Sequence, residues 1–315
     1  MKNLLFIFTF IALSKISFSQ DQRNGTQQIV SASGGHLHGT LLMPADSNKK
    51  MPVVLLIAGS GPTDRDGNQA QLKNNSLKML AEAFQDAGIA SFRYDKRGVG
   101  ASSDFQIDES KLTFDDFVND AVACLQFLKS KNKFSEIIVA GHSEGALIGL
   151  LAAKRAGADK YISICGAGRS IDLVLKEQLA RQPDTIRHQC YVIIDSLKEG
   201  HTVKNVNPLL FSLFRPSVQP FMISWMNYNP VEEIKSLQIP VAIVEGDQDL
   251  QISEEDAKAL KAAYPSASYF FIHGMNHVLK APITSQQENI DAYTNPNHDL
   301  SKELVSDITA FINAR

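Results

Sequence analysis

Cysteine is scarce in this sequence of 315 residues, which contains only Cys124, Cys165 and Cys190. An odd, sparse set does not form a disulfide framework, and none of the three has the spacing of a zinc-ligand motif. Cys124 and Cys165 lie in apolar surroundings that are typical of small core residues. The chain is therefore not a disulfide-scaffold protein, and we expect no structural zinc.

Long apolar segments and a strong charge of either sign are also missing. Beyond the N-terminus, no stretch approaches the ~18 consecutive apolar residues of a membrane-spanning helix. Lys and Arg number 31 against 34 Asp and Glu, giving a net charge of -3, and no basic run is interleaved with aromatic residues. These absences argue against stable membrane insertion and against a nucleic-acid partner.

The first 19 residues have the three-part pattern of a secretory signal peptide. Lys2 supplies a positive charge, residues 4–13 form a short apolar core, and Ser17-Phe18-Ser19 places small residues before the expected cleavage point. An apolar core of about ten residues is too short to span a bilayer, and the alternative is a buried N-terminal helix. We expect an exported protein, periplasmic or secreted.

Strand-like and helical segments alternate after residue 28, which predicts a mostly parallel, eight-stranded sheet flanked by helices. The expected strands cover residues 27–31, 37–42, 53–58, 89–94, 137–140, 161–165, 241–245 and 269–272. The first two resemble an antiparallel hairpin with Gly34-Gly35 as its turn. In such a sheet, ligand chemistry belongs at the carboxyl ends of the parallel strands.

One interval of about 70 residues, between the sixth and seventh expected strands, has no strand signal and is too long for a single crossover. Helical patterns cover residues 171–181, 185–197, 209–214 and 220–227. We expect residues 166–236 to form a helical cap, inserted into an α/β core made of residues 20–165 and 237–315.

A serine stands between two glycines where the fifth strand meets a helix, in Gly141-His142-Ser143-Glu144-Gly145. The glycines permit a sharp turn that exposes the serine at a helix N-terminus, where backbone amides stabilise an anion. This setting favours a nucleophile over a plain turn serine. His142 is expected to point away from Ser143 and to support catalysis without acting as the base.

A serine nucleophile needs a histidine base and a carboxylate that orients it, which follow the serine in the order acid, then histidine. Asp247 and Asp249 both follow the seventh strand, and His273 and His277 both follow the eighth. The G-x-x-D spacing favours Asp249, and a loop position favours His277. Asp247 is then expected to hold the turn, and His273 to be a structural residue at the strand end.

The loop after the third strand, residues 58–68, reads AGSGPTDRDGN and is a candidate oxyanion loop. Its glycines permit close backbone approach, so we expect the Ser60 amide and the Glu144 amide to bind the oxyanion. The alternative is a plain glycine-rich connector. A Walker A loop is excluded, because its G-x-x-x-x-G-K-[ST] pattern is absent.

These motifs together resemble the α/β-hydrolase superfamily and, more narrowly, exported bacterial esterases of the serine aminopeptidase-like (S33) branch. The resemblance covers roughly residues 28–315. It rests on residues 58–68, 94–102, 141–145, 246–252 and 274–277.

The resemblance implies a catalytic triad of Ser143, Asp249 and His277, with Ser60 and Glu144 as oxyanion donors and a helical cap after the sixth strand. It also implies that the charged residues of the D-x-R-G-x-G-x-S loop, Asp95 and Arg97, brace the rim of the site. One departure is Ala58, which stands where the family has a histidine.

The function expected is that of a carboxylesterase, which cleaves small acyl esters through an acyl-enzyme on Ser143 without a metal or organic cofactor. Three alternatives remain: a peptidase of the aminopeptidase or prolyl-peptidase kind, a thioesterase, and a non-catalytic binding protein on a hydrolase fold. A peptidase would need carboxylates for the substrate's ammonium, such as Glu144, Glu232 or Glu233.

The expected cap is rich in aromatic residues and methionine, which either pack it onto the core or line an acyl pocket. These residues are Phe211, Phe214, Phe221, Met222, Trp225, Met226 and Tyr228.

Overall fold

The computed structural model describes residues 25–45 and 49–314. The expected signal peptide, residues 1–19, lies outside the described residues. Within them, no helix is long and apolar enough to cross a membrane.

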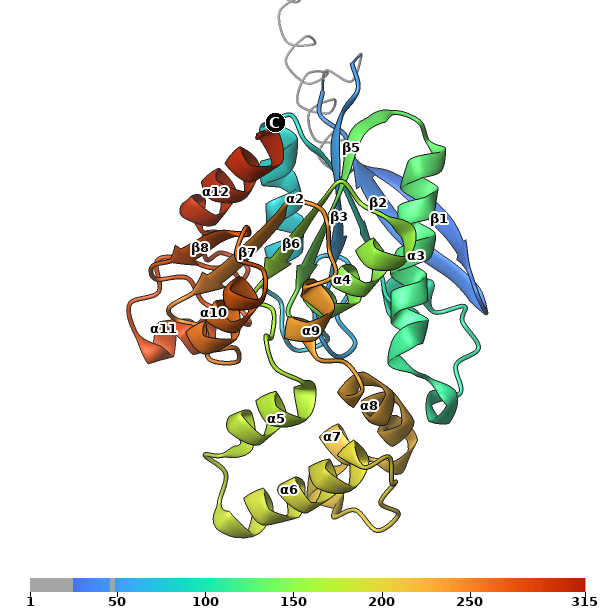
Figure 1. The fold of residues 1–315 in the computed structure, drawn as a ribbon, viewed down its shortest axis with the longest axis vertical. Helices are drawn as coiled ribbons and strands as arrows, with labels where there is room; N and C mark the ends of the chain where they lie inside the picture. Colours follow the sequence, from blue (N-terminus) through green and yellow to red (C-terminus); the bar gives the residue numbers. More distant parts are fainter. Residues whose placement is uncertain (1–24, 46–48, 315) are drawn as a thin grey trace, which may run out of the picture.

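Eight strands form one sheet, in the order β1-β2-β4-β3-β5-β6-β7-β8 (Figure 1). They are β1 (Thr26–Ala32), β2 (Gly35–Leu42), β3 (Met51–Ile57), β4 (Ala90–Tyr94), β5 (Phe134–His142), β6 (Lys160–Ile164), β7 (Val241–Gly246) and β8 (Ser268–Ile272). Strand β2 pairs antiparallel with β1 and β4, and the remaining pairs are parallel. The prediction of a mostly parallel eight-stranded sheet is confirmed.

The turn of the N-terminal hairpin lies one residue earlier than expected. Gly35 already belongs to β2 and pairs with Ala32, so Ser33 and Gly34 form the turn. Gly34 has a φ of +90°, which favours glycine. Gly35 is needed for a different reason, because a Cβ there would lie 2.7 Å from the Phe105 ring.

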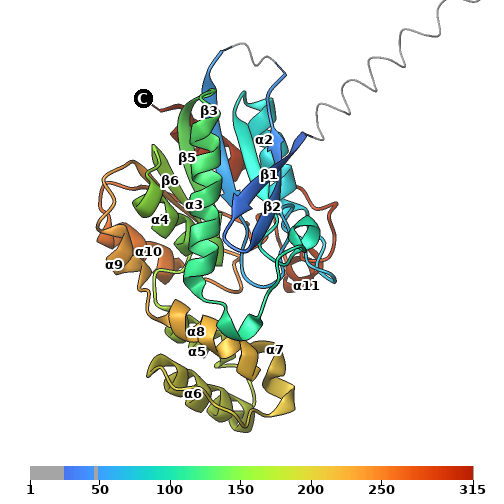
Figure 2. The ribbon, with the colours of Figure 1, turned by 90° about the vertical axis from the view of Figure 1, so that its right-hand side faces the viewer.

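Helices cover both faces of the sheet, and alternate residues of each central strand point to opposite faces. Helices α2 (Ser76–Asp86) and α12 (Lys302–Asn313) lie on one face, where Val54 and Leu56 of β3 are buried. Helices α3 (Phe114–Ser130), α4 (Glu144–Ala156) and α10 (Glu254–Ala263) cover the other face, where Val53 and Leu55 point. Figure 2 shows α3 and α2 on opposite sides of the strands.

The segment between β6 and β7 is helical and carries no strand among its residues, all of which are described. Its helices are α5 (Ile171–Leu179), α6 (Asp184–Lys198), α7 (Phe211–Phe214), α8 (Gln219–Met226) and α9 (Pro230–Ile234). Helices α5 to α8 form a layer beyond the carboxyl ends of the parallel strands (Figures 1 and 2). Helix α9 packs instead against α4 and α10 of the core.

Four short 3₁₀ turns and one further helix complete the described structure. The turns are Gly100–Ser102, Glu109–Lys111, Pro208–Leu210 and Pro216–Val218, and the helix is α11 (Gln286–Asp291). All three cysteines are buried and unpaired.

Candidate active site

Ser143 occupies the apex of a sharp turn between β5 and α4. Its backbone has φ 56° and ψ -123°, a conformation that costs a non-glycine residue of the order of 1–3 kcal/mol. A Cβ at Gly141 would lie 2.0 Å from the carbonyl oxygen of Gly145, and a Cβ at Gly145 would lie 2.4 Å from the carbonyl oxygen of Ile57. Both glycines of the motif are therefore required by close backbone contacts, as expected of a nucleophile elbow.

Asp249 and His277 are in direct contact, although 28 residues separate them along the chain. The Nδ1 of His277 lies 2.6 Å from Oδ2 of Asp249, and both side chains are almost fully buried. The other carboxylate oxygen accepts the amides of Gln251 at 2.7 Å and Ile252 at 3.0 Å. Burial acts to raise the pKa of Asp249, but His277 and these two amides outweigh it and hold the pKa below its usual value.

An ionised Asp249 can only accept hydrogen bonds, so Nδ1 of His277 carries the proton of the neutral imidazole. The second ring nitrogen, Nε2, is then left with a lone pair. This is the tautomer that a general base requires.

The alternative acid and base, Asp247 and His273, contact each other through their side chains, and neither lines the cavity that holds His277. The His273 side chain is 94% exposed. Asp247 accepts the backbone amide of Gly274 at 2.7 Å, which fits the expectation that it holds the turn.

Ser143 and His277 line the same cavity of about 370 Å³, together with Gly59 and Ser60. We call it the histidine-side cavity. The Ser143 hydroxyl does not cap its own helix, and among the described residues no hydrogen bond joins it to the imidazole. A nucleophile and its base often tighten into a hydrogen bond only when substrate is bound.

The structure gives His142 a role that its place in the motif does not reveal. Its Nε2 lies 2.7 Å from the backbone carbonyl oxygen of His277 and, since a carbonyl only accepts, Nε2 must donate. The two imidazole rings lie 4.8 Å apart. Burial, and then the proximity of His277, lower the pKa of His142 to about 3. His142 is thus a neutral donor that anchors the loop carrying His277.

Acid is expected to destabilise the protein through His142. In the unfolded chain its imidazole takes up a proton near pH 6.5, whereas in the folded chain it stays neutral down to about pH 3. The unfolded state therefore binds one more proton in this window, so stability falls as the pH drops, by about 1.4 kcal/mol per pH unit. Denaturant unfolding of wild type and His142→Gln between pH 7 and pH 4 measures this contribution as the difference between their slopes.

The matched control for that measurement is His188→Gln, which removes an exposed histidine of the cap helix α6. It should retain the wild-type dependence of stability on pH. Equal slopes for wild type and His142→Gln would contradict the expectation.

The oxyanion loop passes directly against the elbow. A Cβ added at Gly59 would lie 3.2 Å from the Cβ of Ser143, which is closer than most Cβ contacts, so glycine favours this close approach of the backbone. Among the hydrogen bonds of the described residues, none uses the backbone amide of Ser60 or Glu144 as donor. Both amides are therefore available next to Ser143, as the sequence analysis expects of oxyanion donors.

Asp95 and Arg97, which are expected to support the rim of the site, bind neighbouring segments of the core. Asp95 accepts the Arg65 guanidinium at 2.7 Å and the amides of Arg65 and Ala101, both at 2.8 Å. It thereby ties the oxyanion loop to the loop that follows β4. Arg97 makes a paired interaction with the carboxylate of Asp120, at 2.8 and 2.7 Å. Neither side chain lines the histidine-side cavity.

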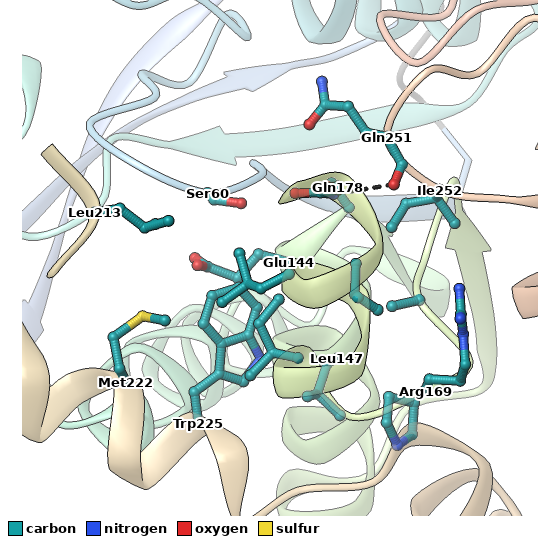
Figure 3. Close-up of a pocket in the computed structure, with 16 residues that line it drawn as sticks. Ser60, Glu144, Leu147, Arg169, Gln178, Leu213, Met222, Trp225, Gln251 and Ile252 are labelled. Carbon is teal, nitrogen blue, oxygen red and sulfur yellow. Dashed lines mark hydrogen bonds between the residues drawn. The ribbon is translucent and has the colours of Figure 1, made fainter. Parts of the chain in front are cut away.

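A second cavity of about 200 Å³, the cap-side cavity, lies between the core and the cap (Figure 3). Its apolar lining consists of Leu147, Ala167, Ile171, Val174, Leu175, Leu213, Met222, Trp225, Pro230 and Ile252. Ser60, Ser143 and Glu144 also line it. It is closed on one side by a hydrogen bond of 3.0 Å from the Gln178 side chain to the carbonyl of Gln251, which joins the cap to the core.

The sequence leaves open which cap residues pack the cap onto the core and which line an acyl pocket, and the structure distinguishes the two roles. Met222 and Trp225 line the cap-side cavity. Phe214 and Met226 are buried without lining it, and the Phe221 ring packs against Phe114 (tilted) and Phe117 (edge-on). Tyr228 donates a hydrogen bond to Asp115, and Phe211 is exposed. Packing and cavity lining are thus both present in the cap, on different side chains.

Two clusters of potential metal ligands occur among the described residues, each with its ligand atoms within 4.8 Å. One is His142, Cys165 and His277, and the other is Cys165, Glu245 and Asp249. Burial raises the pKa of the Cys165 thiol well above its ordinary value, and an ion would compete with the Asp249–His277 hydrogen bond. The donors therefore fit a hydrolytic triad better than a metal site.

Ser143, Asp249 and His277 follow β5, β7 and β8, which is the order of the triad residues in α/β-hydrolases, and the chain has the α/β-hydrolase fold. Residues 74–185 match the family model described as serine aminopeptidase, S33. That segment includes the elbow but neither Asp249 nor His277.

Among curated proteins, esterase EstD of Thermotoga maritima is 28% identical over 230 residues, which are 70% of this chain and 52% of that protein. The chain therefore spans about half the length of this relative.

Among solved structures, Est1E from Butyrivibrio proteoclasticus with bound ferulic acid matches with a TM-score of 0.63 and 18% identity, covering 91% of this chain and 100% of that one. Proline iminopeptidase of Mycobacterium smegmatis matches with a TM-score of 0.57 and 15% identity, covering 91% and 97%. These likenesses show a shared fold.

Proposed function

We propose that the protein is a serine carboxylesterase that cleaves small acyl esters through an acyl-enzyme on Ser143. The observation that carries the proposal is the buried Asp249–His277 pair at the cavity that Ser143 also lines. The similarity to a protein named as an esterase supports the same reaction class.

The proposed reaction uses only groups of this chain and water. The Ser143 oxygen attacks the acyl carbonyl while Nε2 of His277 takes the hydroxyl proton, and the amides of Ser60 and Glu144 stabilise the negative oxygen that forms. His277 then returns the proton to the departing alcohol. Water, activated by the same histidine, releases the carboxylic acid, and Asp249 stabilises the imidazolium in both halves.

We assign the two halves of the ester to the two cavities. His277 must protonate the leaving alcohol, so the alcohol occupies the histidine-side cavity, which His277 lines. The acyl group then enters the cap-side cavity, whose walls are mainly apolar. A volume of about 200 Å³ suits a short or medium acyl group.

Met222→Ala is expected to shift the acyl preference toward longer chains, because Met222 lines the cap-side cavity. Since one methylene in an apolar pocket is worth about 1–3 kcal/mol, the ratio of kcat/KM for octanoate over acetate should rise roughly tenfold or more. A series of p-nitrophenyl esters of increasing chain length measures this ratio. Met226→Ala is the matched control, since Met226 is buried in the same helix without lining the cavity. An equal shift in both variants would contradict the assignment.

The peptidase alternative lacks a free carboxylate for a substrate ammonium among the three candidates. Glu144 is buried and paired with Lys96, Glu233 pairs with Lys154, and Glu232 pairs with Lys235. The ester therefore remains the better substrate class, although a peptidase shares the fold.

Two assays test the proposal directly. A fluorophosphonate probe should label Ser143 in the wild type. Absence of an adduct would contradict an activated serine and favour the alternative of a non-catalytic binding protein. Hydrolysis rates of p-nitrophenyl acetate, an acyl thioester and aminoacyl-nitroanilides then separate esterase from thioesterase and peptidase. The proposal requires the oxygen ester to react fastest.

We further propose that the protein is exported. The charged start, the apolar core of residues 4–13 and the small residues 17–19 support this. Sequencing the N-terminus of the protein recovered from the periplasm or medium of a bacterial host should find a start near residue 20. Retention of Met1 would contradict export.

A further inference from the structure

A buried lysine, Lys96, contacts both segments that carry the expected oxyanion amides. The side chain of Lys96 is only 3% exposed, and its Nζ lies 2.5 Å from the carbonyl oxygen of Gly59. The same Nζ lies 3.6 Å from Oε1 of Glu144, whose side chain is 4% exposed. One ammonium group thus contacts the peptide before Ser60 and the side chain of Glu144, the two residues whose amides flank the nucleophile.

The planarity of the peptide bond connects the lysine to the Ser60 amide. The carbonyl of Gly59 and the N–H of Ser60 belong to one trans peptide, in which they point in opposite directions. Fixing the oxygen on Lys96 therefore aims the N–H away from Lys96. Because Gly59 packs against Ser143 and Ser60 lines both cavities, the N–H is held on the cavity side of the loop.

We propose that Lys96 is a positioning residue that holds the oxyanion hole in its working geometry, through the Gly59–Ser60 peptide and through its ion pair with Glu144. The inference rests on the proposed esterase function. A cation on the carbonyl oxygen also polarises the peptide, which strengthens the Ser60 N–H as a donor to negative charge.

The energetics of burial support a functional reason for the pair. Burial lowers the pKa of Lys96 and raises that of Glu144, and the attraction between them only partly opposes these shifts. Ion pairs removed from water are often no more stabilising than apolar residues of similar volume. Stability alone therefore gives little reason to place a lysine and a glutamate together here.

A double variant, Lys96→Met with Glu144→Gln, tests the proposal without leaving an uncompensated buried charge. Glu144→Gln keeps the backbone amide of residue 144. Losing one oxyanion donor costs about 10²–10³ in kcat, so a misaligned donor should cost roughly 10–100-fold. We expect this fall in kcat for p-nitrophenyl acetate with little change in KM, in the double variant and in Lys96→Met alone.

Binding of phenylboronic acid, which forms a tetrahedral adduct with an active serine, provides the second readout. Its affinity should fall by a factor similar to that of kcat, because the adduct needs the oxyanion donors. Lys160→Met is the matched control, since Lys160 is also buried and its Nζ holds two backbone carbonyls, of Ile312 at 2.6 Å and Ala314 at 2.7 Å. It should lose stability while keeping kcat and boronate affinity.

The outcomes separate this inference from the proposed function. An active wild type whose double variant keeps wild-type kcat and boronate affinity would overturn the inference alone, as would an equal loss in Lys160→Met. A wild type that neither hydrolyses the ester nor binds the boronate would overturn the proposed function and the inference with it.

Discussion

Ser143→Ala is expected to lower turnover of p-nitrophenyl acetate by about 10⁴–10⁶-fold, because the variant has no atom that can form the acyl-enzyme. The remaining rate should come from the oxyanion amides and from substrate binding. Folding should be little affected, since the Ser143 hydroxyl does not cap α4 and alanine replaces a side chain of nearly the same size. Steady-state kinetics and denaturant unfolding of the two proteins provide the measurement.

Ser60→Ala is the matched control for that substitution. Ser60 lines the same two cavities as Ser143, but only its backbone amide has a role in the proposed reaction. Removing its hydroxyl should therefore cost far less than removing that of Ser143. Near-wild-type turnover in Ser143→Ala, or an equal loss in both variants, would refute the nucleophile.

The sequence predicts the fold well where apolar patterning decides the structure. Continuous apolar runs such as residues 53–57 become strands buried on both faces, because helices cover both sides of a parallel sheet. Boundaries are less predictable. The expected helix over residues 171–181 ends at Leu179 in the structure, and α11 and α12 are not among the helices expected from the sequence.

For the candidate site, spacing along the chain predicts Asp249 and His277 in preference to their neighbours Asp247 and His273. The pair Asp249 and His277 and the pair Asp247 and His273 each form in the structure, but only the first is buried at the cavity. Asp249 and His277 lie beyond the strand ends, where a loop can turn back over the sheet. The catalytic roles themselves stay predictions until the variants are measured.

What sequence cannot provide is the set of contacts between distant segments that hold the site in place. Lys96 reaches Gly59 across 37 residues, and His142 reaches the carbonyl of His277 across 135 residues. Neither contact follows from periodicity or motif spacing. Both depend on how the segments that follow β3, β4, β5 and β8 come together at the carboxyl ends of the strands. Burial of charged or imidazole groups is the structural signal that reveals them.

Asp249→Asn is expected to lower kcat by about 10⁴-fold, through the tautomer of His277. The carboxylate accepts the Nδ1 proton at 2.6 Å and leaves Nε2 with its lone pair. An asparagine that turns its NH₂ group toward the ring donates to Nδ1 instead, so the proton moves to Nε2, which then cannot accept the proton of Ser143. The backbone amides of Gln251 and Ile252 can still bond to the remaining amide oxygen, so the loop should keep its shape. The kinetics of p-nitrophenyl acetate hydrolysis measure the loss.

Asp247→Asn is the matched control for Asp249→Asn, because it removes the negative charge of the other carboxylate in the same loop. Asp247 bonds to the amide of Gly274 and pairs with the exposed His273, outside the cavity that holds His277. An asparagine oxygen can still accept from Gly274, so turnover should stay close to that of the wild type. If Asp247→Asn were the damaging change and Asp249→Asn the mild one, the acid would be misassigned. The buried contact between Asp249 and His277 would then hold the loop in place without tuning the base.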